Sequence, residues 1–547
     1  MLFKYLLALT VMLGTLTLVG CGGGGGGGGG LGSNITAPDT DGDGDGVADE
    51  NDNCVDESNE DQADADVDGV GDACDALPAT YAFEDDSGAS TVSYTGQSAR
   101  QVLVSDLVSA MLALERNAAT VPSDVVADLN FYISLDPDIR DASYPPNFAL
   151  SGGESIIVND DDAPSETIVP GAISSGKDII SKFAGNDKED HILGGEFFGW
   201  TGFSTPADLL DEYLRILAEE TADTTDSIAI AGGTANIGTP TVTEEGLDLR
   251  QLIQKFTIGA LTFSQGTADY MSIDYGSDAN LTLAEGKSYT EGAHDFDEAF
   301  GYFGAARNYT EQGDEVIKDP AYQDSVVSDG AIDLRSEFNF ANSTNCAKRD
   351  LGTAENSNPT DYTTEVFNAF VLGHEILQNA ATGATESSPG SLSAEATAAL
   401  NAQIVIAAQT WEKCIAATVV HYINDTVGDM DNFVNDDFSD LDNFLTLAKH
   451  WAEMKGFALG LQFSPYSPFR TGAVDGTDVG ANVSDLKKVL SLMGEAPVLA
   501  DGTQNGSLFG GALSASEAKD AYRADLLAAR DILERAYAFD SENVANW

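Results

Sequence analysis

Apolar and polar residues alternate with a helical period along most of the chain after residue 98. Apolar residues recur there at intervals of three and four positions, which places them on one face of a helix. Ser, Asp or Pro stands near several segment starts, where helix N-termini favour them. We therefore predict a mainly α protein, built as one helical bundle or two packed bundles, with helices at residues 98–116, 205–220, 248–271, 296–309, 362–380, 393–427, 441–463, 482–494 and 514–539.

A short segment ahead of these helices has a different pattern. Residues 80–96, "TYAFEDDSGASTVSYTG", alternate apolar and polar positions, which is typical of a small β-hairpin or cap. Gly, Asp, Asn and Pro are frequent at 141–176 and 221–247, which we expect to be long loops. Because no clear boundary interrupts the helical pattern, we treat residues 77–547 as one helical domain.

The first 20 residues have the features of a bacterial lipoprotein signal peptide. The apolar run from Tyr5 to Leu18 is too short for a comfortable membrane span. It ends in "LVGC", a pattern typical of signals that are removed before a cysteine, which is then acylated. Residues 21–38 would form a lipidated, glycine-rich tether. We expect an exported lipoprotein anchored through Cys21, and the absence of an aspartate after Cys21 favours the outer membrane, at its periplasmic or surface face.

The charge of the chain limits its partners. It carries 90 acidic and 26 basic residues, a formal net charge of −64. Such a chain is a poor ligand for nucleic acid, whose phosphates are neutralised by Lys and Arg. It favours cations instead. The expected partners are therefore the membrane, through the lipid anchor, and a protein of the cell envelope.

Two acidic loops have the spacing of calcium sites. In each loop, carboxylates fall at positions 1, 3, 5, 9 and 12, and a glycine at position 6 permits a sharp turn. Alternating hard oxygen ligands of this kind wrap a calcium ion, with the carbonyl of position 7 contributing. The predicted calcium ligands are Asp41, Asp43, Asp45, Asp49 and Asp52 in the first loop and Asp64, Asp66, Asp68, Asp72 and Asp75 in the second.

The acidic segment also resembles a known repeat. "NDNC", "NEDQADAD" and "GVGDACD", within residues 39–76, are similar to thrombospondin type 3 repeats. The resemblance implies an irregular fold organised around calcium ions rather than around an apolar core. Position 12 is Asp in both loops, which fits these repeats. An EF-hand would have Glu at this position, so the loops resemble an EF-hand less. We expect a calcium-stiffened stalk that extends the tether.

Four cysteines are left once Cys21 is acylated. An even number in an exported chain predicts two disulfides. Of the three connectivities, the most economical joins Cys54 to Cys74 and Cys346 to Cys414. The second pair would link two distant segments of the helical domain.

The histidines are candidate ligands for a transition metal. Acidic residues stand three or four positions after some of them, so imidazole and carboxylate share a helix face. Helical bundles bind metals through such groups, and this donor set suits iron or zinc. Alternatively, each histidine is a core or interface residue balanced by its acidic neighbour, which is the interpretation we favour, most of all for His191, His374 and His421. The candidate ligands are His294, Asp297, Glu298, His450 and Glu453.

Two further resemblances concern the helical domain. "HDFDEAFGYFG", "WEKCIAATVVHYIND", "AKHWAEMKGFALGLQF" and "RDILERAYAFDSENVANW" resemble an uncharacterised family of exported bacterial proteins known only as a domain of unknown function. "GAHDFD" is similar to the G-x-H-x-x-E motif of imelysin-type proteins, exported helical bundles proposed to bind metal or to act as peptidases. Gly292, His294 and Asp297 match that motif, with Asp in place of Glu.

These features favour binding over catalysis. The sequence has neither a G-x-S-x-G nor an H-E-x-x-H motif. We expect a cell-envelope lipoprotein with a calcium-binding stalk and a helical domain that binds a ligand or a metal, with a role in iron uptake. The alternatives are a structural, adhesion or partner-binding module and, third, a metallopeptidase.

Overall fold

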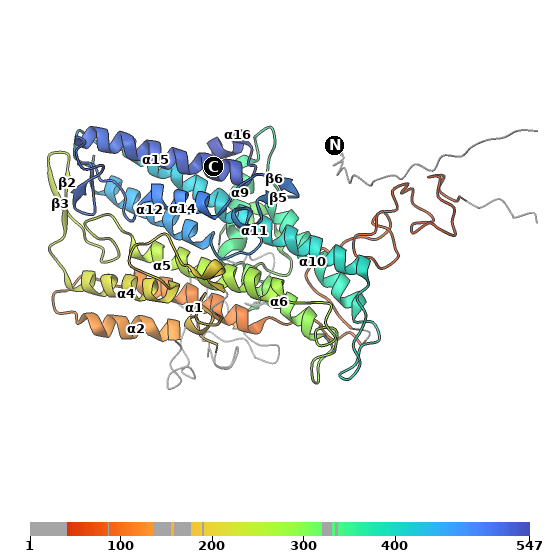
Figure 1. Ribbon diagram of the computed structural model, residues 1–547. Coiled ribbons are helices and arrows are strands. Elements are labelled where there is room, and N and C mark those ends of the chain that lie inside the picture. Colours follow the sequence, from red (N-terminus) through yellow and green to blue (C-terminus); the bar gives the residue numbers. More distant parts are fainter. Residues whose placement is uncertain are drawn as a thin grey trace, which may run out of the picture.

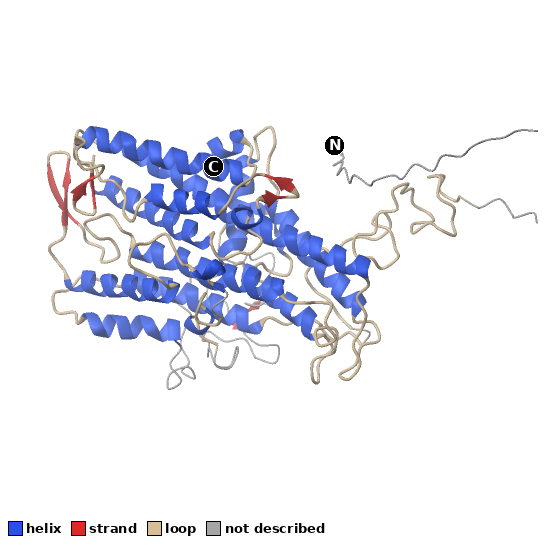
Figure 2. Ribbon diagram, in the orientation of Figure 1, coloured by secondary structure: helices blue, strands red, loops and turns tan. Residues whose placement is uncertain are grey.

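The computed structural model describes residues 41–85, 87–134, 155–157, 177–188, 191–319, 331–333 and 337–547. The predicted signal peptide, Cys21 and the tether lie outside these residues. The described part is mainly helical, as predicted, with only short strands (Figure 2). Its buried apolar side chains form one continuous cluster, so the helices build one bundle rather than two.

The long helices lie side by side along the body of the molecule (Figure 1). Their bounds are α1 Thr95–Leu112, α2 Pro122–Ser134, α4 Pro206–Ala222, α5 Leu249–Thr257, α6 Glu291–Phe303, α9 Ala341–Thr353, α10 Tyr362–Ala380, α11 Ala394–Asp429, α12 Leu441–Gly460, α14 Val483–Met493 and α15 Ala515–Ala536. Shorter helices are α7 Tyr309–Gln312, α8 Asp314–Ile317, α13 Pro468–Thr471 and α16 Ser541–Asn546.

The strands form separate two-stranded pairs. β1 (Ser155–Ile157) and β4 (Ala331–Asp333) are parallel, and the other pairs are antiparallel hairpins. These are β2 (Ser227–Ile230) with β3 (Gly233–Asn236), β5 (Ala473–Val474) with β6 (Thr477–Asp478), and β7 (Thr503–Gln504) with β8 (Ser507–Leu508). The first hairpin lies inside 221–247, which the sequence predicted to be a loop.

Side-chain caps explain where several helices begin. Ser393 and Asp440 accept hydrogen bonds from the backbone N–H groups of Ala396 and Asn443, at the starts of α11 and α12. Ser514 forms a reciprocal capping box at the start of α15. Such caps satisfy N–H groups that the first turn of a helix leaves unpaired.

Helix α11 lies at the centre of the bundle, between α10 and α12. Its Trp411 is fully buried, with its ring 5.3 Å from the rings of both Phe263 and Phe303. Trp411 also lies against Gly266, where an added Cβ would be only 2.6 Å from the indole. The chain from Ile258 to Asp269 continues α5 with a wider, π-helical winding. A side chain at position 266 would therefore displace the central tryptophan.

A disulfide joins α9 to α11. The Cα atoms of Cys346 and Cys414 are 4.8 Å apart, and both side chains are fully buried. The bond therefore links two helices of the core that are separated by 68 positions in sequence.

The segment at 80–94 caps the helices, which is one of the two forms that its sequence pattern predicts. Tyr81 and Phe83 are buried against the helices, with the Tyr81 ring stacked 3.9 Å from Phe300 of α6. The backbone also turns back on itself around an antiparallel bridge between Glu84 and Ser90. The N–H of Thr91 donates to the carbonyl of Phe83 at 2.9 Å, so the cap contains a short antiparallel pairing that is not long enough to form strands.

The acidic segment, residues 41–76, contains neither helix nor strand. It extends from the end of the body where α10 ends (Figure 1). A disulfide between Cys54 and Cys74 holds it, with Cα atoms 5.7 Å apart. Among the described residues, no helix combines the length and apolarity that a bilayer crossing requires.

Candidate metal-binding sites

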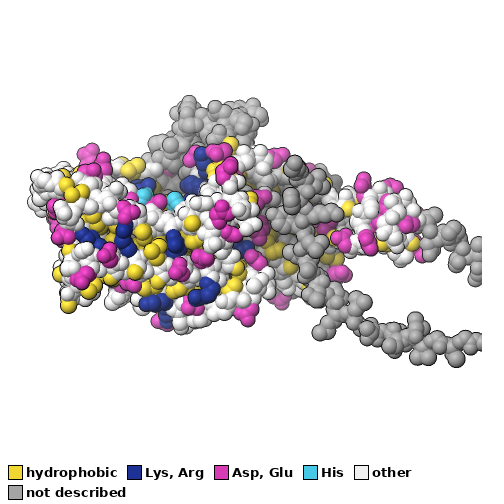
Figure 3. Space-filling view, turned by 90° about the horizontal axis from the view of Figure 1, so that it is seen from above, with side chains coloured by type: hydrophobic (Ala, Val, Ile, Leu, Met, Phe, Trp, Pro, Cys, Tyr) yellow, Lys and Arg dark blue, Asp and Glu magenta, His cyan; other side chains and the backbone are white. Residues whose placement is uncertain are grey.

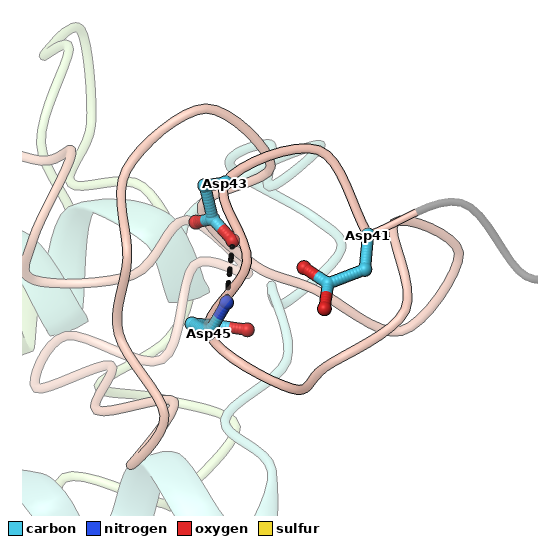
Figure 4. A group of neighbouring side chains, drawn as sticks. All are labelled: Asp41, Asp43 and Asp45. Atoms are coloured by element: carbon cyan, nitrogen blue, oxygen red, sulfur yellow. Dashed lines mark hydrogen bonds between the residues drawn. The ribbon is translucent and has the colours of Figure 1, made fainter.

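The first acidic loop gathers three carboxylates. One oxygen from each of Asp41, Asp43 and Asp45 lies within 4.8 Å of the others. The three side chains face the inside of the loop, where Asp43 accepts a hydrogen bond from the backbone of Asp45 (Figure 4). Gly46 has a φ of 100°, which a side chain would oppose. The carboxylates at positions 1, 3 and 5 and the turn at position 6 therefore lie where a cation loop would need them.

The other carboxylates of this loop close it. Asp49 accepts a hydrogen bond from the N–H of Gly42 at 2.8 Å, and Asp52 accepts one from Cys54 at 2.9 Å. The second oxygens of Asp43 and Asp52 are buried without a hydrogen-bond partner. Burial and the carboxylates of Asp45, Asp52 and Asp41 raise the pKa of Asp43. Buried oxygens without donors are groups that a bound cation would satisfy.

The second loop repeats this arrangement. Oxygens of Asp64, Asp66 and Asp68 lie within 4.8 Å of one another. Asp72 accepts from the N–H of Ala65 at 2.7 Å, the equivalent of the bond between Asp49 and Gly42 in the first loop. Asp75 has a raised pKa, caused by burial and then by Asp68, Asp72 and Asp64. Two segments of equal spacing therefore adopt the same local fold.

Asp66 differs from its counterpart because it is buried. Only 7% of the residue is exposed, whereas Asp43 is partly exposed. Burial, Asp68 and Asp64 raise the pKa of Asp66 to about 6. Its Oδ2 accepts a hydrogen bond of 3.0 Å from the side-chain amide of Asn379, in the last turn of α10.

Helix α10 also directs a carboxylate toward this loop. Glu375 precedes Asn379 by four residues and so lies on the same helix face. Its pKa is raised to about 7, by burial first and then by Asp66, Asp75 and Asp68. Sequence reasoning missed both residues, because nothing in "HEILQN" distinguishes a helix face that meets a loop more than 300 positions away.

The histidine candidates do not form one cluster. His294 is paired with Glu298 on α6, at 3.8 Å, and its ring stacks on Tyr289. Glu453 on α12 is paired with Lys255, at 3.5 Å. Within the described residues, only the two aspartate loops bring three ligand atoms within 4.8 Å of one another.

Asp297 lies in the core, away from His294. It accepts hydrogen bonds from the hydroxyl of Tyr81 at 2.8 Å and the backbone of Ser93 at 2.9 Å, and it lies 2.9 Å from Nδ1 of His374. The three side chains of Tyr81, Asp297 and His374 are fully buried. This network fastens the cap segment to α6 and α10, which is a structural role.

His450 meets other partners than those predicted. Its Nδ1 lies 2.9 Å from Oδ2 of Asp429, and its Nε2 lies 3.8 Å from Oδ2 of Asp425. His421, which we had expected to be a core or interface residue, contacts the same Asp425 oxygen at 3.3 Å. The acidic partners of His450 thus come from α11.

An aromatic cleft of 440 Å³ lies beside α14. Phe197, Phe198 and Trp200 line it together with Lys487 and Glu495. The ammonium of Lys487 is 5.0 Å from the centre of the Phe198 ring. The cleft combines apolar walls with both signs of charge, as small-molecule sites do.

Comparison with known proteins gives one match. Residues 207–441 match a family described as "Domain of unknown function (DUF4856)", a range that runs from α4 to the first residue of α12. No curated protein and no solved structure matched the chain. The resemblances to type 3 repeats and to imelysin-type proteins stay predictions. Residues 207–441 are therefore similar to this family of unknown function, and the match lies inside a helical body that continues to the C-terminus.

Proposed function

We propose that this protein is an exported lipoprotein that binds calcium through loops 41–52 and 64–75, and that calcium fastens the acidic segment to the helical domain. The observation that carries the proposal is the position of Asp66. This buried carboxylate faces Asp64 and Asp68 within its own loop and is held by Asn379 of α10.

Electrostatics supports a cation at this junction. The segment from Asp39 to Asp75 contains no Lys or Arg, and acidic side chains are scattered over its surface among uncharged ones (Figure 3). Mutual repulsion contributes to the raised pKa of Asp66 and of Glu375. A divalent ion would replace this repulsion with attraction, and it would be the largest local charge.

The donor set favours calcium over other ions. All the candidate ligands are carboxylate or carbonyl oxygens, which suit a hard cation that accepts six to eight ligands. Magnesium requires stricter octahedral geometry and keeps several waters, so a loop of many oxygens favours calcium. Iron and zinc prefer sites with imidazole or thiolate donors, which the loops do not offer.

In this proposal, bound calcium fixes the orientation of the helical domain relative to the lipid anchor. A docked junction gives the domain a defined direction, whereas the glycine tether before it is flexible. The helical domain then meets a ligand or an envelope protein, and the aromatic cleft beside α14 is the candidate place for a small ligand. This assignment places binding, rather than peptide cleavage, at the centre of the function.

Calorimetric titration of the chain from residue 22 onward tests the proposal. We expect two calcium ions, one for each loop, and no equivalent binding of magnesium. Asp43→Asn and Asp66→Asn should each remove one ion. Asp56→Asn is the matched control, because Asp56 lies exposed between the loops and outside their ligand positions. Calcium binding that survives both loop substitutions would refute the proposal.

A further inference from the structure

Helices α11 and α12 bring two imidazoles to one carboxylate. Nε2 of His421 and Nε2 of His450 lie 3.3 Å and 3.8 Å from the same oxygen, Oδ2 of Asp425. His421 and Asp425 are four residues apart on α11, and His450 comes from α12, which packs along α11. Two nitrogen donors and one oxygen donor therefore converge from two helices.

The other ring nitrogen of His450 faces a fixed acceptor. Nδ1 of His450 lies 2.9 Å from Oδ2 of Asp429. The backbone of Trp547 lies next to the ring of His421, and an oxygen of Trp547 accepts a hydrogen bond of 3.0 Å from the side chain of Asn424. Histidines that bind metal commonly donate their second N–H to a carboxylate or a carbonyl in this way, which fixes the ring and directs the free nitrogen to the ion.

The group is accessible to an ion from solvent. The side chains of His421, Asp425, His450 and Asp429 are 29%, 35%, 18% and 13% exposed. On the face in Figure 3, histidine side chains lie at the surface next to acidic ones. Water could complete the coordination from this side, as it does in open zinc sites.

We propose that His421, Asp425 and His450 bind a first-row transition metal ion such as Zn²⁺, with Asp429 positioning the ring of His450. Imidazole and carboxylate donors suit this class of metal. The three donor atoms are not all within 4.8 Å of one another, so binding closes the group by rotation of a ring. The site is separate from the calcium loops and is independent of the function proposed for them.

The alternative is a network of ion pairs without metal. In that arrangement, a protonated His450, whose pKa Asp429 and Asp425 raise, and a neutral His421, whose pKa burial and Arg349 lower, share Asp425. Metal affinity distinguishes the two, because an ion-pair network binds no metal stoichiometrically.

The chain offers a matched control for this test. His294 and Glu298 on α6 have the same four-residue spacing, a distance of 3.8 Å and comparable exposure. Among the described residues, His294 pairs with Glu298 but has no second imidazole beside it and no further carboxylate that orients its ring. A site that depends on convergence should therefore be lost in His421 or His450 variants and kept in His294→Ala.

The experiment is titration with Co²⁺ and Zn²⁺ in saturating calcium, on the chain from residue 22 without a histidine tag, followed by absorption and calorimetry. We expect one ion with a visible Co²⁺ spectrum. Affinity should fall at least 100-fold in His421→Gln and His450→Gln, and about 10-fold in Asp429→Asn. The proposal would be overturned if the wild type bound no metal stoichiometrically. It would also be overturned if both glutamine variants bound metal as tightly as the wild type, or if His294→Ala lost as much affinity as they do. Circular dichroism of each variant would verify that the fold is retained.

Discussion

The side-chain amide of Asn379, at the end of α10, donates a hydrogen bond of 3.0 Å to the carboxylate of Asp66 in the second acidic loop. Sequence spacing predicted a stalk that extends the tether and gave no contact with the helical body. The hydrogen bond joins the second loop to that body. An ion bound in the second loop would therefore also affect the contact between this loop and α10.

Removal of the Asn379 amide should weaken calcium binding at the second loop only. We expect Asn379→Ala to lower that affinity at least tenfold, since a hydrogen bond to a charged group such as the buried Asp66 contributes about 1.5–3 kcal/mol. Calorimetric titration would separate the two loops. Gln378→Ala is the control, because the Gln378 amide faces the backbone of Glu84 rather than the loop. An equal effect of both variants would argue against a specific role for Asn379.

The junction should respond to pH in the absence of calcium. The folded pKa values of Asp66 and Glu375, about 6 and about 7, lie above the ordinary values near 4. Folding therefore favours their protonated forms, so the unfolding free energy should fall as pH rises from about 4 to about 7. Saturating calcium should remove this decline, because it binds the ionised forms. Calorimetric melting temperatures with calcium and with chelator would measure the difference.

Glu375→Gln provides the check on this pH effect. It should flatten the decline near pH 7 in the calcium-free protein without unfolding it, because the amide keeps the shape of the side chain. An unchanged pH profile in this variant would show that Glu375 does not sense the loop.

Asp297→Asn should destabilise the fold without affecting metal binding. It weakens a fully buried network with Tyr81 and His374, and breaking such a pair lowers stability by about 3–5 kcal/mol. Urea unfolding would measure the loss. Glu298→Gln, one position along on the partly exposed face of α6, should change stability by less than about 1 kcal/mol. Loss of metal binding with unchanged stability in Asp297→Asn would contradict the structural role.

Lys455→Met should stabilise the protein at neutral pH. Burial lowers the pKa of Lys455 to about 7, and its ammonium has the carbonyl of Leu490 as a hydrogen-bond acceptor. The folded pKa is below the ordinary value of 10.5, so the unfolding free energy of the wild type rises between about pH 7 and 10.5. The methionine variant should lack this rise and gain on the order of 1–3 kcal/mol at pH 7. Lys449→Met, at a half-exposed position on α12, is the control; the same gain there would exclude the burial argument.

Periodicity predicted the long helices well because their apolar faces are buried by packing. The predicted segments 393–427 and 441–463 correspond to α11 at Ala394–Asp429 and α12 at Leu441–Gly460. The π-helical winding at 258–269 had no such signal, because apolar periodicity does not distinguish it from an α-helix. Alternation at 80–96 left a hairpin and a cap both open, because it does not measure the burial of Tyr81 and Phe83 against the helices.

Among the candidate sites, those within one short segment could be predicted from the sequence, whereas those that join distant segments could not. The aspartate loops are local, so their spacing in sequence already contains their geometry. Asp297 follows His294 by three positions, which is a rotation of about 60° around the helix axis. That rotation is enough to turn Asp297 into the core while Glu298 stays beside His294. Contacts such as those of Asp66 with Asn379, or of His450 with Asp425, join distant segments and leave no trace in the spacing.

Hydrogen exchange at the end of α10 tests the central claim most directly. The chain from residue 22 would be compared in calcium and in chelator, with Asp66→Asn as the control. If calcium fastens the acidic segment to the helical domain, it should slow exchange both in the loop at 64–75 and in α10 at 372–381, and Asp66→Asn should abolish both effects. Calcium protection confined to the loop, with α10 unchanged, would contradict the account.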